Sequence, residues 1–410
     1  MPVSRLRSAG FGLALLLLVG AVPTLGWVGL TLIRDSKAGT LTTRVSDPRA
    51  PGYEAIVDPT PTALLVQKDA KGHLVSLTFV ALGGSQGGGS LVFLPIDLAV
   101  EKPAYGIDRF LTAYNSGGEP RLVGMVGDSL NIGLGDVIDV DDASWAALTA
   151  KSAPIRFTNP DTVVSGSLRF PAGPIALRPN EVGPYLAAKV DRNESDLNRL
   201  NRHQLFWQAW LKSIGPSPSA GAVPGEMRSG IGFFVRTLAA GPVRSEPLPV
   251  KAQGTPLYQG GQVFFPLVGQ VRKDLTAMVP YPTAPSPGAR VSVRLLNGAD
   301  GDPIPSTIVQ KLVLEGAAVT VVGNDRRFNR RETVIQYRDP AEQERAKRMR
   351  VALGGHGKVR FSPQGSDAVD VTIVLGRDLL AAGRPSSGAR PPTSKPGSAT
   401  TATRGQGSGG

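Results

Sequence analysis

"TALLVQKDAKGHLVSLTFVALGGSQGGGSLVFLPI", Thr62 to Ile96, holds three runs rich in apolar residues, separated by polar or glycine-rich turns. The runs TALLV, LVSLTFVAL and SLVFLPI predict three strands. Helical periodicity follows at Arg121–Leu130, Ser144–Thr149 and Asn198–Ile214. Strands interleaved with helices predict an α/β or α+β sandwich of mixed sheet and helices, extending over residues 55–279.

The glycine-rich stretch GGSQGGGS, Gly83 to Ser90, lies between two of these predicted strands. A phosphate-binding loop would need a helix directly after it and, in a P-loop, a Lys-Ser/Thr pair. Here a strand follows and no lysine is near. The stretch therefore predicts a flexible hairpin loop.

A second domain is predicted after the proline-rich segment YPTAPSPGA, which marks a linker at residues 280–289. Residues 290–380 contain, in order, a strand (RVSVRLLNG), a helix at Ile304–Gly316, two strands (AAVTVVG and ETVIQY), a helix at Pro340–Leu353 and a strand (AVDVTIVLG). This β-α-β-β-α-β order is the one expected for a ferredoxin-like domain. Residues 381–410 are Gly, Pro, Ser and Thr with almost no large apolar side chain, which predicts a disordered tail.

The N-terminus carries a candidate membrane segment. Residues 9–33 form an uncharged run which, as a helix, exceeds the roughly 30 Å hydrocarbon core of a bilayer. Arg5 and Arg7 precede it, so the positive-inside rule predicts a cytoplasmic N-terminus at residues 1–8 and an extracytoplasmic location for the rest. A cleaved signal peptide is the alternative, but its apolar region is usually about 7 to 15 residues long. The sequence favours a single-pass anchor in the cell membrane, followed by a linker at residues 34–54.

The composition excludes several classes of protein. The absence of cysteine excludes disulfide frameworks, thiolate metal sites and cysteine nucleophiles. The three histidines, His73, His203 and His356, lie far apart and show no metal-ligand spacing, so the spacing predicts no metal site. The net charge of +12 indicates an anionic partner, which leaves nucleic acid, anionic lipid and acidic envelope polymer open.

The stretch DLNRLNRHQLFWQAW, Asp196 to Trp210, predicts a helix with an unusual charge distribution. On a helical wheel the apolar stripe comprises Leu197, Leu200, Gln204, Trp207, Leu211 and Ile214. Asp196, Arg199 and His203 lie at its margin, and Arg202 lies further round, toward solvent. Arginines beside a helix N-terminus form a good receptor for phosphate or pyrophosphate. The competing interpretation is that Asp196 pairs with Arg199 and the other charges are solvated.

Two segments resemble a known family. FPAGPIALRPNEVGPYLAAK and DLNRLNRHQLF, within Phe170–Phe206, together with GIDRFLTAYNSGGEP, Gly106–Pro120, resemble motifs of the LytR-CpsA-Psr (LCP) envelope domain. RVSVRLLNGADG, VTVVGNDRRF, ETVIQYRDP and DVTIVLGRDLL, within Arg290–Leu380, are similar to the LytR C-terminal domain that often follows an LCP domain in actinobacteria.

The resemblance implies a membrane-anchored protein that holds a polyprenyl-pyrophosphate-linked glycan and passes it to peptidoglycan. It implies an apolar tunnel for the lipid, and arginines and an aspartate-bound Mg²⁺ that grip the pyrophosphate, because phosphoryl transfer depends on positioning and charge neutralisation. The family pattern carries over to Arg199 and Arg202 as catalytic residues. The ligand-binding positions it implies are Tyr185 and Lys189, in the strand expected before the helix, together with Asp196 and Gln204. His203, which lies at the margin of the apolar stripe, is a further candidate ligand-binding residue.

Other positions depart from the family pattern. Pro61 stands where the family has its metal-binding Asp, Ala187 and Ile96 stand in place of two arginines, and Leu111 replaces an Asn. An apolar side chain cannot compensate pyrophosphate charge. We therefore expect a glycopolymer-binding protein with weak or no glycopolymer-peptidoglycan phosphotransferase activity.

Two alternatives remain open. The protein could be a non-enzymatic envelope scaffold that docks through its C-terminal domain. It could also be a DNA-binding transcriptional attenuator, supported by the basic run ERAKRMR at Glu344–Arg350, although only about eight residues are expected in the cytoplasm. The same run fits a solvated helix face opposite a stripe of Ala346, Met349 and Leu353, so no nucleic-acid partner is expected.

Overall fold

The computed structural model describes residues 45–84, 86–102, 106–191, 194–216, 221–254, 262–364 and 368–380. The predicted cytoplasmic residues 1–8, the membrane segment 9–33, residues 34–44 of the linker and the tail 381–410 lie outside this described part. Within these described ranges, no helix has both the length and the apolar character needed to cross a membrane.

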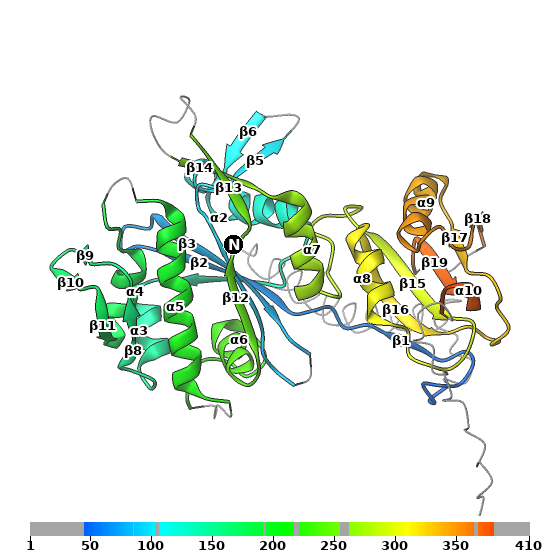
Figure 1. The fold of residues 1–410 in the computed structure, drawn as a ribbon, viewed down its shortest axis with the longest axis horizontal. Helices are drawn as coiled ribbons and strands as arrows, with labels where there is room; N and C mark the ends of the chain where they lie inside the picture. The colour runs from blue at the N-terminus through cyan, green and yellow to red at the C-terminus, as the bar shows by residue number, and fades with distance from the viewer. Residues whose placement is uncertain are drawn as a thin grey trace, which may run out of the picture.

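A mixed five-stranded sheet organises the first domain, with strand order β12-β4-β3-β2-β7 (Figure 1). Its strands are β2 (Thr62–Lys68), β3 (Leu74–Leu82), β4 (Gly89–Leu94), β7 (Asp136–Val140) and β12 (Val243–Pro247). The first three are antiparallel neighbours and confirm the strands predicted from the opening runs, whereas β7 and β12 join the edges in parallel. Every residue of β3 is buried, so this strand is covered on both faces of the sheet.

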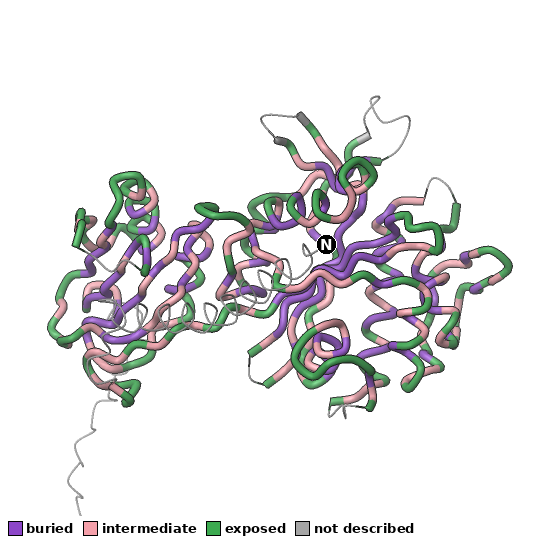
Figure 2. Tube along the Cα trace, turned by 180° about the vertical axis from the view of Figure 1, so that it is seen from behind, coloured by how far each residue is buried: buried purple, intermediate pink, exposed green. Residues whose placement is uncertain are grey.

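Helices cover both faces, which confirms a mixed α/β architecture. On one face lie α3 (Asp142–Thr149), α4 (Pro179–Ala187), α5 (Asp196–Ile214) and α6 (Gly230–Ala239), and on the other lie α2 (Phe110–Leu130) and α7 (Val268–Met278). Alternate residues of the strands enter the two cores, because side chains of a strand point to opposite faces. In Figure 2 the buried residues gather along these central strands.

Helix α2 is longer than the sequence predicts. The periodic pattern indicates a helix only from Arg121, but the structure places its start at Phe110. Gly118 has a non-helical conformation with φ of 65°, and Pro120 follows it, so the helix is kinked there. Because Gly118 and Pro120 are both unfavourable inside a helix, the sequence pattern does not predict the first half of α2.

Four two-stranded ribbons surround this core. They are β5 (Ala99–Lys102) with β6 (Gly106–Arg109), β8 (Ile155–Asn159) with β11 (Gly173–Leu177), β9 (Val163–Ser165) with β10 (Leu168–Phe170), and β13 (Val250–Gly254) with β14 (Gln262–Pro266).

The strand expected to carry Tyr185 is instead helix α4, so that prediction is wrong. Pro179 occupies the first turn of α4, where a missing N–H costs nothing. The carboxylate of Glu181 accepts a hydrogen bond from the backbone N–H of Arg178 at 2.8 Å, which caps the helix start. Local helix-starting signals therefore outweigh the family pattern at this point.

The second domain contains the elements predicted for it and one additional strand. They are β15 (Val291–Asn297), α8 (Ser306–Leu314), β16 (Ala317–Asn324), β17 (Val334–Tyr337), α9 (Gln343–Ala352), β18 (Lys358–Phe361), β19 (Val371–Leu375) and the short α10 (Arg377–Leu380), with a 3₁₀ turn at Pro340–Glu342. The sequence does not predict β18. Residues Ala346, Met349 and Leu353 are buried, as expected for the apolar stripe of α9.

The ferredoxin-like topology predicted for this domain is wrong. The sheet order is β1-β16-β15-β19-β17-β18. In a ferredoxin-like sheet another strand separates the two strands joined by a helix. Here β15 pairs directly with β16, and β17 pairs directly with β18, both in parallel. The order of elements along the chain does not determine which strands pair. Strand β19 lies between β15 and β17, so it joins the β15–β16 pair to the β17–β18 pair.

The predicted boundary near Ala55 is also corrected by the structure. Strand β1 (Glu54–Ile56) pairs antiparallel with β16, so it belongs to the sheet of the second domain although it precedes the first. The Asn324 side chain donates hydrogen bonds to the carbonyls of Pro48 and Ala50. The described end of the predicted linker is therefore part of the second domain.

Candidate functional site

The predicted site residues meet at the N-terminal turns of α5, where this helix approaches the segment after β4. Asp196, Arg199, Arg202, His203 and Tyr185 are all buried. Gln204 is half-buried and donates to the Ser245 carbonyl at 2.5 Å, while Lys189 is exposed.

The buried face of α5 differs from the predicted stripe. Leu197, Gln204 and Ile214 are only partly buried, whereas Phe206 and Trp210 are fully buried. Arg202, predicted to point toward solvent, is 1% exposed. The wheel fails because α4 and the segment after it cover a second side of the helix. The Arg202 guanidinium donates to Ala188 at the end of α4.

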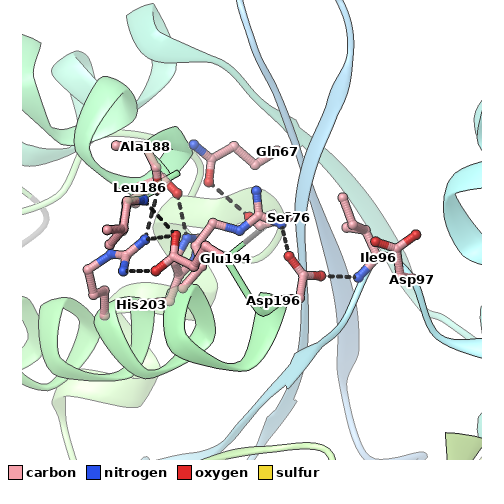
Figure 3. Close-up of polar contacts among 12 residues, drawn as sticks. Gln67, Ser76, Ile96, Asp97, Leu186, Ala188, Glu194, Asp196 and His203 are labelled. Carbon is pink, nitrogen blue, oxygen red and sulfur yellow. Dashed lines mark hydrogen bonds and ion pairs between the residues drawn. The ribbon is translucent and has the colours of Figure 1, made fainter. Parts of the chain in front are cut away.

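Arg199 is held by Asp196. Its Nη2 atom donates to Asp196 Oδ1 at 2.5 Å, and both side chains are 3% exposed. The second oxygen, Oδ2, accepts the backbone N–H of Ile96 at 2.8 Å (Figure 3). Asp196 thus joins α5 to the end of β4 and neutralises Arg199, which is the pairing anticipated by the competing interpretation.

Arg202 is held by a carboxylate that sequence reasoning missed. Its Nη1 and Nη2 atoms donate to the two oxygens of Glu194 at 2.5 and 2.9 Å, and Nη2 also donates to the Ala188 carbonyl at 2.9 Å. Burial raises the pKa of Glu194, but the hydrogen bonds from Arg202 and from the Val190 N–H outweigh it and lower the pKa overall. This bidentate geometry is the one an arginine would offer to a phosphate.

His203 is neutral in this environment. Its Nε2 lies 2.8 Å from the Leu186 carbonyl, which identifies this nitrogen as the protonated donor (Figure 3). Burial, followed by the charge of Arg199, lowers the pKa of His203 to about 3. An uncharged ring that is already bonded to a carbonyl adds no positive charge for an anionic ligand.

The remaining site positions also serve the fold. Tyr185 donates its hydroxyl to Asn159 Oδ1 at 2.9 Å, and burial raises its pKa. Ile96, which stands in place of a family arginine, buries its side chain in the core on the α2 side. Asp97 pairs with Arg109 at 3.0 Å, and burial, followed by the charge of Asp196, raises its pKa. No sequence signal pointed to the ion pairs of Glu194 or Asp97.

The residues at this site do not fit the Mg²⁺ that the resemblance implies. Both oxygens of Asp196 already accept hydrogen bonds. Asp97 stands opposite Arg109, and Pro61 offers no ligand. Throughout the part of the chain that the structure describes, no three His, Asp or Glu side chains gather in a way that could hold a metal ion.

Aromatic side chains fill the space between α5 and α3 and belong to the hydrophobic core on this face of the five-stranded sheet. Trp145, Phe206, Trp207 and Trp210 contact one another, with ring centroids 5.1 to 6.4 Å apart. The rings of Trp207 and Trp210 are almost completely buried. The apolar layer beneath this helix is thus occupied by the protein's own side chains.

Comparisons with known proteins add to this picture. Residues 290–379 match the family model described as LytR cell envelope-related transcriptional attenuator. No curated protein matches the chain. Similar solved structures include Bacillus subtilis TagV (TM-score 0.46, 16% identity, covering 56% of this chain and 100% of TagV). TagT bound to LIIa-WTA is another (TM-score 0.43, 18% identity, 58% of this chain and 94% of that one).

A further structure, of the LytR-CPS2A-psr family protein YwtF (TagT) with bound octaprenyl pyrophosphate lipid, is similar at a TM-score of 0.41 and 16% identity. It covers 58% of this chain and 94% of its own. Residues 290–379 thus match the model of a LytR C-terminal domain, and more than half of the chain is covered by these solved structures at low sequence identity.

Proposed function

We propose that this protein acts in the cell envelope as a glycopolymer-binding scaffold with weak or no phosphotransferase activity. In this proposal residues 9–33 anchor it in the cell membrane, and the two described domains lie outside, facing peptidoglycan. Its partner is a polyprenyl-pyrophosphate-linked glycan or a related anionic envelope polymer. The match of the second domain to an envelope-related family supports this location.

The pairing of the two arginines at α5 is the observation that carries the proposal. A pyrophosphate would have to displace Asp196 from Arg199 and Glu194 from Arg202. The displaced carboxylates of Asp196 and Glu194 would then be left buried without an arginine, and removing one partner of a buried ion pair costs about 3 to 5 kcal/mol. The carboxylates therefore occupy the donors that phosphoryl transfer would require.

The first test is a turnover assay on the full chain in detergent. The protein is incubated with a polyprenyl-pyrophosphate-linked glycopolymer, Mg²⁺ and peptidoglycan, and we follow the covalent attachment of the phosphorylated glycopolymer and the release of polyprenyl phosphate. We expect no product above the protein-free rate. Clear turnover that Arg199→Ala abolishes would show that α5 carries a working transferase site, and would overturn the proposal.

The second test measures binding without turnover. Co-sedimentation of the full chain with glycopolymer-bearing cell walls is compared with walls from which the anionic polymer has been extracted by acid. We expect retention only on the polymer-bearing walls. Equal retention on both would exclude the glycopolymer as the partner and favour docking to peptidoglycan itself.

A further inference from the structure

A cleft of about 440 Å³ lies where the two domains meet. The first domain contributes residues at the end of α2 and the start of α7, and the second contributes residues after α8 and Arg345 and Arg348 of α9. These helices are labelled in Figure 1. A volume of this size accommodates an organic ligand of several units rather than a single ion.

Arginines dominate the charge of this cleft. Arg272, Arg345 and Arg348 line it, and Glu315 is the one acidic side chain among the lining residues. Arg345 is partly engaged, by the Gly288 carbonyl at 2.9 Å and by Glu342. Arg348 is exposed and has no hydrogen-bond or ion-pair partner within the ranges that the structure describes. The basic run that suggested nucleic acid in the sequence therefore forms one wall of the cleft.

Arg290, which follows the lining residue Ala289 in the sequence, adds a buried positive charge in a neighbouring hollow at the ends of α2 and α8, which Arg272 also lines. It is 9% exposed, and among the described residues it donates to the carbonyls of Asn131, Val313 and Ala317, at 2.7, 3.2 and 3.0 Å. Burial, followed by the charge of Arg272, lowers the pKa of Arg290 to about 10. No carboxylate in the described part of the chain pairs with it. An anion bound at Arg272, which lines both hollows, would partly offset this positive charge.

The remaining lining favours one class of anion. No aromatic side chain is among the described residues that line the cleft, whereas base-containing chains are usually held by stacking on aromatic rings. Instead, aliphatic Val268, which is 60% exposed, and the polar Ser129 and Asn131 flank the arginines. Such a surface suits a flexible phosphodiester chain without bases.

We propose that this interdomain cleft binds a segment of a base-free phosphodiester polymer, such as a chain of glycerol or sugar phosphates. The arginines pair with successive phosphates, and the aliphatic edge contacts the linking carbons. The identity of the polymer rests on the proposed envelope function, whereas the site itself rests on the cleft and its charges. It does not involve the closed arginine pairs of α5.

The experiment uses the full chain in detergent and a fluorescently labelled glycerol phosphate oligomer, with binding followed by anisotropy. Arg348→Gln removes an exposed charge from the cleft, and we expect about tenfold weaker binding, as for one charge-assisted contact. Arg360→Gln, at an exposed arginine of β18 outside the cleft, is the matched control and should change affinity less than twofold. Glu315→Gln removes the opposing charge and should strengthen binding. Melting curves check that each variant is folded.

Three results would overturn the proposal. Equal weakening by Arg348→Gln and Arg360→Gln would indicate attraction to net charge alone. Tighter binding of a single-stranded oligonucleotide of equal charge would identify nucleic acid as the ligand class. Absence of oligomer binding would remove the site, while retention on polymer-bearing walls would still leave the proposed envelope function standing.

Discussion

At the residue scale, the first turns of α5 bury two arginines beside two carboxylates. The pairing of Asp196 with Arg199 could be predicted, because residues three apart on a helix are neighbours. The pairing of Glu194 with Arg202 could not, since Glu194 lies before the helix begins and its position depends on how the chain leaves α4. The fold thus brings the predicted arginines together, but each guanidinium pairs with a buried carboxylate of the protein and not with solvent.

Glu194 provides a direct test of this closed arrangement. Glu194→Ala leaves the Arg202 charge buried without its main partner, so we expect a loss of about 3 to 5 kcal/mol in the free energy of unfolding. Urea denaturation followed by tryptophan fluorescence measures the loss. Glu344→Ala, which breaks the exposed pair with Lys347, is the control and should cost less than about 1 kcal/mol. Similar losses in both variants would contradict the burial argument.

His203 should make stability depend on pH. Its pKa is about 3 in the folded protein, against about 6.5 when unfolded, so the unfolded state binds the extra proton between these values. The contribution is complete above pH 6.5 and is lost as the pH falls. Between pH 7 and pH 5 the loss should be about 2 kcal/mol.

His203→Gln keeps a neutral donor near the Leu186 carbonyl and should flatten this slope in urea titrations at pH 7, 6 and 5. His73→Gln changes an exposed imidazole and should retain the slope of the unmodified protein. If His203→Gln retains the slope as well, another group is responsible for it.

At the element scale, the apolar runs predicted β2, β3 and β4 well, because a strand buried on both faces of a sheet has apolar side chains at nearly every position. The glycine-rich turn between β3 and β4 was correctly predicted as a hairpin connection. Its packing was not predictable, since it depends on α6. Gly88 donates its N–H to the Thr237 carbonyl at 2.7 Å, and Gly89 donates to the Pro242 carbonyl at 3.0 Å.

Two glycines in this turn should respond differently to alanine. Gly88 has φ of +80°, and an added Cβ would lie 2.2 Å from the Pro242 carbonyl oxygen, whereas a Cβ on Gly84 would meet nothing within 4 Å. We expect Gly88→Ala to cost at least about 2 kcal/mol and Gly84→Ala less than about 1 kcal/mol in thermal or urea unfolding. Equal effects would show that the hairpin is not seated on α6 as described.

At the scale of the whole molecule, the order of most helices and strands in residues 290–380 could be predicted from periodicity. The sheet order of the second domain could not, nor could the position of β1. Three residues with the sequence EAI carry too little pattern to identify a strand, and their partners in β16 lie far along the chain. Long-range pairing of this kind is decided by tertiary packing.

Asn324 ties the segment before the first domain to the second. Asn324→Ala removes the donors to the Pro48 and Ala50 carbonyls, so we expect faster hydrogen exchange in residues 45–56 with little change elsewhere. Mass spectrometry of peptic peptides measures this. Asn329→Ala, at an exposed position in the connection after β16, is the control. Unchanged exchange in residues 45–56 would show that backbone hydrogen bonds, from β1 and from Gly52 and Tyr53, hold the segment without the Asn324 side chain.

The pairing of β1 with β16 also sets a schedule for biosynthesis. Glu54 leaves the ribosome long before Gly323, its partner in the sheet. At about 5 to 20 residues per second, the interval is on the order of 10 to 50 s. The first domain has time to fold while β1 waits with an unpaired edge. The sheet of the second domain can be completed only after β16 has been synthesised, so β1 pairs late although it is made early.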